Sequence, residues 1–273
     1  MQASSAWTAP GGTLGRIVAE ARERVQALHA RESELVRAAE HAGPAPSFAR
    51  ALRANTVGVI AEVKRRSPSK GWINANISAA DQARAYERGG AVAISVLTEP
   101  AHFGGSVADL EAVRDAVHLP ALKKDFHVDP LQLVEARAVG ASAALLIARA
   151  LAPSELVALV GTARALALEV LVEIRDEAEL DRALGAGATI VGINNRNLET
   201  LEIDPATSER LLARIPESVV AIAESGVSSR ADVERVARAG AHGVLVGSAI
   251  SKSSDPAAAV AELSGVARAR RGN

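Results

Sequence analysis

Two pairs of oppositely charged residues in this chain could transfer protons. Glu62 and Lys64 stand two residues apart at the end of an apolar run that begins at Val57, and side chains two apart on a strand point to the same side. Lys124 and Glu173 each close a further apolar run. Burying an ion costs several kcal/mol unless it is well paired, so a sequence selected for stability alone would place apolar residues there. The two pairs therefore indicate a functional site.

A weak internal repeat predicts the elements that position these residues. Four times, a helical segment ends at a glycine and an apolar strand follows, and four other apolar segments alternate with these strands. Eight strands that alternate with helices are typical of a single (β/α)8 barrel. The alternative, a doubly wound open sheet, has less support because no glycine-rich dinucleotide turn follows the first strand. The glycines are Gly90, Gly140, Gly187 and Gly240, and the other segments are Val57–Val63, Leu119–Lys124, Leu168–Glu173 and Val219–Ala223.

Residues 1–50 are predicted to be a helical extension of one barrel domain that covers residues 1–273. Apolar residues recur at helical spacing from Leu14 to Leu28, and Thr13 is the expected N-cap. Two positions are open for this helix: a cap across the bottom of the barrel, or a wall of the active-site mouth. The last residues, 267–273, are expected to be a solvent-exposed helix end whose arginines lie near the negative end of the helix dipole.

Polar residues close seven of the eight predicted strands. Barrel enzymes build their sites at the C-terminal ends of strands, so this bias predicts a charged pocket. Any one such residue is more often an ordinary solvated rim residue, and only the joint pattern carries the inference. The residues are Glu62 and Lys64, Thr98 and Glu99, Lys123 to Phe126, Glu173, Asn194 to Arg196, Glu224 to Gly226, and Gly247 with Ser248.

The seventh and eighth strand ends favour a phosphate monoester as the ligand. Ser225-Gly226 and Gly247-Ser248 each place backbone N–H groups beside a hydroxyl, and a short helix can begin at Ser248. These loops are the usual phosphate position in such barrels, although either dipeptide alone is a common turn. Lys64 is expected to add a positive charge from across the barrel.

Lys124 and Glu173 are the expected acid and base. They end the third and fifth strands, and alternate strands contribute side chains to the same layer of a barrel, so the two can face each other. Different surroundings could then separate their pKa values and their roles. A lysine in this position can also be a cationic clamp or a Schiff-base nucleophile. Lys123 is expected to point to the opposite face.

Composition argues against several other functions. A net charge of −1 and an aromatic content of 2% disfavour nucleic acid as a partner. The six histidines lack metal-binding spacing, cysteine is absent, and no Gly-x-Ser-x-Gly motif occurs. No apolar run is long enough to span a membrane, and residues 1–5 do not resemble a signal peptide. We therefore expect a cytoplasmic enzyme without a membrane partner, and the sequence is compatible with a monomer.

In combination, seven motifs resemble the indole-3-glycerol phosphate synthase family of tryptophan biosynthesis. The resemblance covers the barrel and implies a carboxy-lyase that needs no cofactor and no metal. The implied reaction closes the ring of 1-(2-carboxyphenylamino)-1-deoxyribulose 5-phosphate with loss of CO2 and water. The motifs are AEVKRRSPSKG at 61–71, LTEPAHFGGS at 97–106, LKKDF at 122–126, LVEI at 171–174, GINNRNLETLEID at 192–204, AESGV at 223–227 and VLVGS at 244–248.

The resemblance also implies roles for single residues. Lys124 is similar to the general acid that activates the ketone, Glu173 to its partner in the later dehydration, and Lys64 to a cation on the substrate. Asn195 and Trp72 depart from the expected pattern, and Trp72 could alter the motion of its loop. The other implied positions are Glu62 and Asn194 as polar active-site residues, Arg196, Ser67 and Pro68 around the anthranilate part and its carboxylate, Phe126 and Glu224 as substrate-binding residues, and Ser225, Gly226, Gly247 and Ser248 at the phosphate.

Three other functions stay open. A phosphoribosylanthranilate isomerase needs a cysteine or a comparable base early in the barrel, and cysteine is absent. A lyase or aldolase would use Lys124 as a Schiff-base nucleophile. A binder of phosphate metabolites would need the phosphate loops without Lys124 and Glu173, so the presence of both residues favours the synthase.

Overall fold

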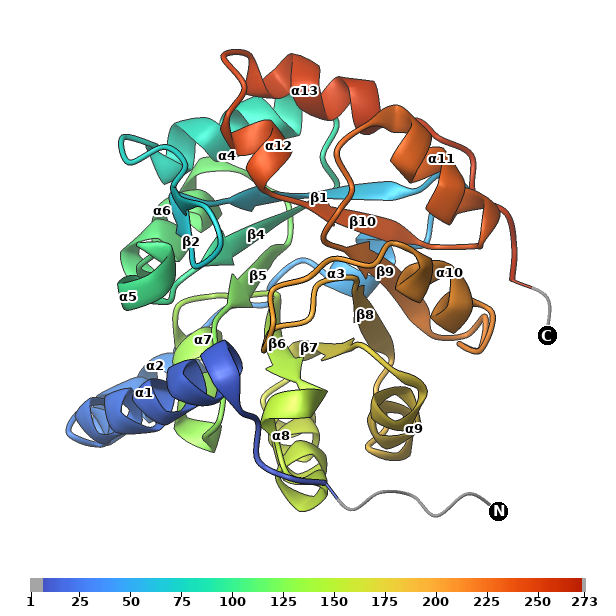
Figure 1. Cartoon of the computed structure of the whole chain (residues 1–273). Helices are drawn as coiled ribbons and strands as arrows, with labels where there is room; N and C mark the ends of the chain where they lie inside the picture. The colour runs from blue at the N-terminus through green and yellow to red at the C-terminus, as the bar shows by residue number, and fades with distance from the viewer. Residues whose placement is uncertain (1–6, 272–273) are drawn as a thin grey trace, which may run out of the picture.

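The computed structural model describes residues 7–271, in which eight parallel strands close into a barrel surrounded by helices (Figure 1). The predicted (β/α)8 barrel is confirmed, and each predicted strand occurs within a few residues of its expected position. A two-stranded antiparallel hairpin of β2 (Arg66–Ser67) and β3 (Gly71–Trp72) follows the first barrel strand. The barrel strands are β1 (Gly58–Val63), β4 (Ala93–Leu97), β5 (Ala121–Lys124), β6 (Ala143–Ile147), β7 (Glu169–Ile174), β8 (Ile190–Asn194), β9 (Val220–Glu224) and β10 (Gly243–Val246).

The helices begin and end at local sequence signals. Ser106, Asp176 and Ser229 each cap a helix by accepting a hydrogen bond from a backbone N–H of the first turn. The four repeat glycines have φ between +79° and +90°, a conformation that favours glycine and lets the chain turn from helix to strand. The helices are α4 (Ala79–Arg88), α5 (Pro100–Phe103), α6 (Val107–Ala116), α7 (Pro130–Ala138), η1 (Ala148–Ala150), α8 (Pro153–Ala165), α9 (Glu177–Gly185), α10 (Ala206–Leu212), α11 (Arg230–Arg238), α12 (Ser248–Ser251) and α13 (Pro256–Leu263).

The barrel strands are buried on both faces. Side chains fill the interior while helices cover the outside, so these strands appear in the sequence as continuous apolar runs instead of alternating ones. Closure brings the first and last strands together, since β1 pairs with both β4 and β10. All eight C-terminal strand ends therefore surround one space.

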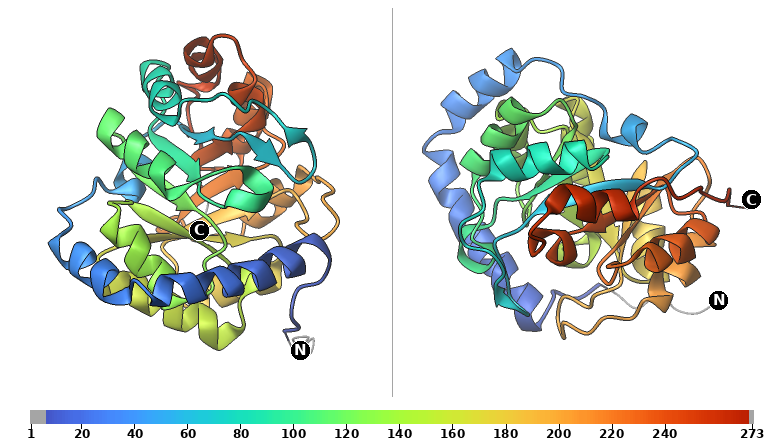
Figure 2. Two further views of the ribbon diagram at one scale, coloured as in Figure 1. Left: turned by 90° about the vertical axis from the view of Figure 1, so that its left-hand side faces the viewer. Right: turned by 90° about the horizontal axis from the view of Figure 1, so that it is seen from above.

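The N-terminal segment forms α1 (Gly12–His29), α2 (Glu32–His41) and α3 (Phe48–Ala51). In Figure 2 the long blue α1 crosses the outside of the barrel, where it packs against α7 and η1, and its first turns reach the C-terminal ends of the strands. Of the two positions left open by the sequence, α1 takes the one at the active-site mouth. The bottom is closed instead after α3, where Leu52 packs beside Gly58 and Gly243 at the N-terminal ends of β1 and β10.

Two expectations about the chain ends are wrong. Gly11, not Thr13, holds the N-cap position of α1, and Thr13 lies in the first helical turn and lines the pocket. Residues 267–271 are not a helix end: Arg271 is buried and donates hydrogen bonds to backbone carbonyls of residues 215, 216, 219 and 240. The first three carbonyls precede β9 and the fourth precedes β10, at the bottom of the barrel. The guanidinium of Arg271 donates the hydrogen bonds that these carbonyls accept.

The sequence predicts no signal peptide at residues 1–5 and a helix end that includes residues 272–273. Both segments lie outside the described residues. Among residues 7–271, no helix has both the length and the apolar character required to cross a membrane. The boundary at residue 50 between extension and barrel stays a prediction.

Candidate active site

A cavity of about 480 Å³ opens at the C-terminal ends of the barrel strands. All fourteen residues that the sequence analysis proposes for the site line this cavity. They come together because a closed parallel barrel gathers its strand ends at one rim. The residues are Glu62, Lys64, Ser67, Pro68, Lys124, Phe126, Glu173, Asn194, Arg196, Glu224, Ser225, Gly226, Gly247 and Ser248.

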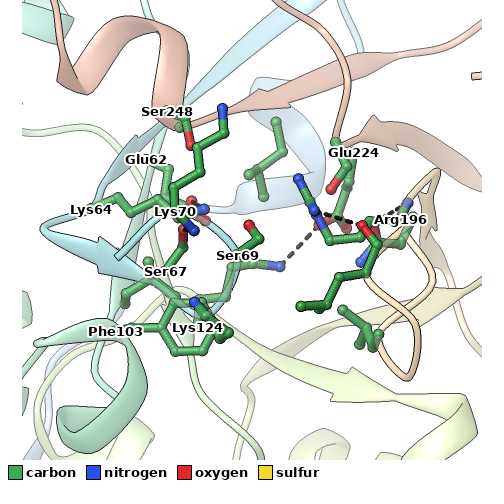
Figure 3. A pocket seen from close by; sticks show the side chains of 18 of the residues that line it. Glu62, Lys64, Ser67, Ser69, Lys70, Phe103, Lys124, Arg196, Glu224 and Ser248 are labelled. Carbon is green, nitrogen blue, oxygen red and sulfur yellow. Dashed lines mark hydrogen bonds and ion pairs between the residues drawn. The ribbon is translucent and has the colours of Figure 1, made fainter. Parts of the chain in front are cut away.

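Lys124 is held between two buried carboxylates. Its Nζ lies 3.3 Å from Glu173 Oε2 and 2.9 Å from Glu224 Oε2 (Figure 3). Lys124 and Glu173 thus face each other as predicted. Glu224, which the sequence suggested only as a substrate contact, is the closer partner. Lys124, Glu173 and Glu224 lie on β5, β7 and β9, which are alternate strands of the barrel. Alternate strands contribute side chains to one layer, so the three groups lie at the same level.

This cluster has one ammonium and two carboxylates, so one carboxylate is left without a counter-ion. Burial raises the pKa of Glu224 to about 7. The positive charge of Lys124 lowers this pKa and the negative charge of Glu173 raises it, but burial has the largest effect. Burial alone would lower the pKa of Lys124, but the carboxylates of Glu224 and Glu173 outweigh it and hold that pKa above its ordinary value. Glu224 Oε1 is buried without a hydrogen-bond partner among the described residues. The cluster can therefore hold one exchangeable proton near neutral pH.

Glu62 and Lys64 form a second ion pair, in which Lys64 Nζ lies 2.9 Å from Glu62 Oε1. The expectation that Lys64 acts from across the barrel is wrong. Because β1 pairs with β10, Lys64 lies beside Gly247, where an added Cβ would be 3.3 Å from Lys64 Cδ. The same Cβ would collide with Glu62 Oε1, so a larger residue at this position would displace the Glu62 carboxylate. The ion pair therefore lies against the loop that follows β10.

In the loops after β9 and β10, the backbone N–H groups of Ser225, Gly226 and Ser248 donate no hydrogen bond within residues 7–271. Ser225 and Gly226 have φ values of +63° and +79°, which turn two successive residues into the left-handed region. The helix α12 begins at Ser248, as predicted, and its N-cap Gly247 forms no side-chain capping bond. Such a turn and helix start expose N–H groups suited to phosphate oxygens.

The opposite half of the cavity suits an aromatic ring that carries an acid. Phe103 and Phe126 have ring centroids 6.2 Å apart, and apolar side chains of α1 and β6 continue this wall. Across from it, Arg196 donates to the Leu201 carbonyl at 2.9 Å, and within residues 7–271 no carboxylate lies within 4.0 Å of its guanidinium. Burial lowers the pKa of Arg196. An arginine in this state is ready to pair with a carboxylate of a ligand.

Several lining residues were not predicted. Phe103 belongs to the LTEPAHFGGS motif, but nothing local in the sequence shows that its ring points inward. The apolar face of α1 looked like an ordinary buried face, and only its docking at the mouth brings it to the ligand. The unpredicted residues include Thr13, Leu14, Ile17, Ser69, Lys70, Leu97, Phe103, Leu145, Ile147, Leu198, Ile203, Ser228 and Lys252.

Residues behind the cavity hold Lys124 and α1 in place. Lys123 points away from the cavity, as predicted, and pairs with Glu135 of α7 at 2.9 Å. Arg24 of α1 lies 2.9 Å from Asp125 Oδ1 and 3.2 Å from Glu99 Oε1. These pairs connect α1 to the loops that follow β4 and β5. The residues on either side of Lys124 in the chain, Lys123 and Asp125, are therefore each fixed by an ion pair to a helix.

The two departures from the expected pattern have different surroundings. Asn195 is buried, donates to the Ser225 carbonyl at 2.9 Å and accepts hydrogen bonds from Ser208, so it links the β9 loop to α10. Trp72 is 61% exposed, and the Arg66 guanidinium lies over its indole ring, with 5.6 Å between Arg66 Cζ and the ring centroid. Asn195 therefore holds the loop after β9 from behind, whereas Trp72 lies on the outer surface of the hairpin.

Residues 14–263 match the family model described as indole-3-glycerol phosphate synthase. The indole-3-glycerol phosphate synthase of Opitutus terrae is 48% identical over 239 residues, which cover 85% of this chain and 90% of that protein. Indole-3-glycerol phosphate synthase 2 of Streptomyces coelicolor is 46% identical over 257 residues, which cover 93% of this chain and 99% of that protein.

Among solved structures, the thiamine phosphate pyrophosphorylase from Pyrococcus furiosus superposes with a TM-score of 0.58 at 17% identity. The match covers 78% of this chain and 95% of that chain, and it supports the barrel fold alone. The family match over most of the chain and the identity to the two synthases together decide the family. The chain belongs to the indole-3-glycerol phosphate synthase family.

Proposed function

We propose that the cavity binds 1-(2-carboxyphenylamino)-1-deoxyribulose 5-phosphate and converts it to indole-3-glycerol phosphate, CO2 and water. Its family makes the chain a carboxy-lyase of tryptophan biosynthesis. The observation that carries the assignment of the chemistry is the ammonium of Lys124 held between Glu173 and Glu224. On one side of it stand the phosphate loops, and on the other stand an apolar wall and Arg196.

Lys124 would act first, as a general acid. The ring carbon that carries the carboxylate attacks the ketone carbon while the ammonium donates a proton to the ketone oxygen. The attack leaves a cationic iminium beta to the carboxylate. The electron pair of the C–CO2 bond then flows into the ring and releases CO2, which restores the aromatic system.

Glu173 and Glu224 would serve the dehydration that follows. One carboxyl group donates a proton to the departing hydroxyl, and the other carboxylate removes a proton from the neighbouring carbon, so that water leaves and the indole double bond forms. This division needs one protonated and one ionised carboxyl at the same pH. The raised pKa of Glu224, to about 7, supports such a division.

The remaining lining residues would orient the substrate. Arg196 suits the carboxylate of the anthranilate part, with Ser67 and Pro68 beside the ring, and Phe126 forms part of the apolar wall. Lys64 and Glu62 bound the sugar part, and Asn194 accepts a hydrogen bond from the Arg196 backbone at 2.9 Å. Ser225, Gly226, Gly247 and Ser248 would bind the phosphate through backbone N–H groups.

The test is the growth of indole fluorescence after addition of the carboxyphenylamino-deoxyribulose phosphate. We expect turnover by the wild type and a kcat lower by about 10² or more for Lys124→Ala. Borohydride added during turnover should leave no adduct on Lys124, since an adduct would support the Schiff-base alternative. Absence of turnover by folded wild-type protein would overturn the proposed activity.

We also propose that the chain works as a monomer in the cytoplasm, since every residue assigned to the site comes from one barrel. A mass near 28.2 kDa by light scattering would support the monomer, and twice that mass would contradict it.

A further inference from the structure

The lysines of this chain are few and gathered at one place. Of the 31 lysines and arginines, five are lysines and the remaining 26 are arginines. Lys123 is buried directly behind the cavity. The four others line it: Lys64, Lys70, Lys124 and Lys252. Lysine is a compact, strongly hydrated charge on a flexible stem, whereas arginine is a planar fork. This distribution indicates that the cavity uses a property that is specific to lysine.

Two of the four lining lysines already have carboxylate partners. Lys124 is paired with Glu173 and Glu224, and Lys64 is paired with Glu62. Their charges are therefore largely compensated before a ligand enters. A phosphate monoester carries close to two negative charges at neutral pH, which backbone N–H groups alone do not neutralise.

Lys70 and Lys252 are the two lining lysines without such a partner. Both are exposed, and within residues 7–271 no carboxylate oxygen lies within 4.0 Å of either ammonium. Lys70 stands between β2 and β3 on the hairpin after β1, and Lys252 follows directly after α12. Figure 3 shows Lys70 on the same side of the cavity as Lys64 and Ser248, away from Arg196 and Glu224. Lys70 thus lies on the Ser248 side of the cavity, and Lys252 directly follows the helix that begins at Ser248, so both uncompensated charges lie near the loop after β10.

We propose that Lys70 and Lys252 form a pair of cations that receives the phosphate dianion of the substrate and makes the site selective for phosphorylated ligands. This inference rests on the proposed function. The hydrated ammonium groups reach from two separate elements and can follow the phosphate as it enters. The charge that they supply is screened by salt because both side chains are exposed.

The test compares the wild type with Lys70→Ala, Lys252→Ala and the double variant. Calorimetric binding of inorganic phosphate, without turnover, gives the affinity of the anion site directly. We expect about fivefold weaker binding for each single variant and about 25-fold for the double variant. With the full substrate, the loss should fall on KM, and kcat/KM should depend less on ionic strength in the double variant.

The matched control is Arg270→Ala, which removes an exposed cation near the C-terminus, outside the cavity. It should bind phosphate like the wild type. A double Lys→Arg variant keeps both charges, so it should bind phosphate more tightly than the double Ala variant but more weakly than the wild type, because it lacks the compact ammonium groups. Unchanged phosphate affinity in the double Ala variant would overturn the inference, even if the enzyme turns over. If turnover fails but phosphate binding still depends on both lysines, the anion site stands and the proposed reaction falls.

Discussion

Gly192 on β8 lies directly against the Glu224 carboxylate, and a methyl group at position 192 would collide with Glu224 Oε1. The absence of a side chain here gives Glu224 the room to approach Lys124. Gly192 belongs to a strand, where glycine weakens the packing, so its presence reflects the space that the neighbouring acid requires.

The substitution Gly192→Ala should displace Glu224 and lower kcat. Overpacking in a filled core costs about 1–3 kcal/mol, so the protein should still fold while kcat falls about tenfold or more. Steady-state kinetics and urea unfolding measure the two effects. Gly161→Ala in α8 is the matched control, because an added Cβ there meets no atom within 4 Å. Equal kcat values for the two variants would contradict the role of Gly192.

The pH profile should report the proton of Glu224. This carboxyl has a pKa of about 7, so it is protonated below neutral pH and ionised above it, and kcat/KM should show a limb near pH 7. Glu224→Gln should remove that limb. In Glu173→Gln the limb should move to lower pH, since the charge of Glu173 raises the pKa of Glu224. A limb that stays near pH 7 in Glu224→Gln would assign it to another group.

Stability should also depend on pH through Glu179, a buried carboxyl of α9. Burial, with a further contribution from Asp176, raises the pKa of Glu179 to about 7. The folded state therefore holds a proton that the unfolded chain releases near its ordinary pKa of 4.5. The contribution to stability is complete below that pH and is lost as the pH rises through 7.

The variant Glu179→Gln cannot lose a proton, so its free energy of unfolding should rise relative to that of the wild type between pH 5 and pH 8. Urea unfolding at several pH values measures the difference. Glu177→Gln on the same helix changes a half-buried carboxyl that pairs with Arg210 and whose backbone hydrogen bond lowers its pKa, and it should show no such gain. A flat difference for Glu179→Gln would show that Glu179 does not titrate in this range.

Much of the fold was predictable because its signals are local. A glycine that must adopt a positive φ and the apolar run after it lie within a few residues of each other, so the repeat reveals the strands. The convergence of Glu62, Lys124 and Glu173 on one cavity follows from barrel geometry alone. The polar residues at the strand ends were therefore sufficient to predict a charged cavity from the sequence.

The unpredicted features depend on contacts between distant segments. Nothing near Glu224 in the sequence shows that it lies closer to Lys124 than Glu173 does. The placement of α1 at the mouth depends on Arg24, which must find Glu99 and Asp125. An amphipathic helix shows which face is buried but not which surface covers it.

The C-terminal tail provides a further test of such distant contacts. Arg271→Ala removes a buried guanidinium and leaves several carbonyls of the barrel bottom without donors, which should cost about 2–4 kcal/mol of stability. The value of kcat should not change, because these carbonyls lie at the end of the barrel opposite the cavity. Arg270→Ala changes an exposed neighbour and should leave the unfolding midpoint unchanged. Similar midpoints for both variants would contradict the anchoring role of Arg271.

The pairing of β1 with β10 has a consequence for how the protein is made. Glu62 and Lys64 are synthesised early, while Gly247 and Ser248 are among the last barrel residues to be joined to the chain. A polypeptide that is still growing, or one cut before residue 243, lacks the strand that closes the barrel against β1 and the residues Gly247 and Ser248 that line the cavity. The cavity is therefore complete only once the closing strand has joined the chain, which leaves an unfinished molecule without a complete site.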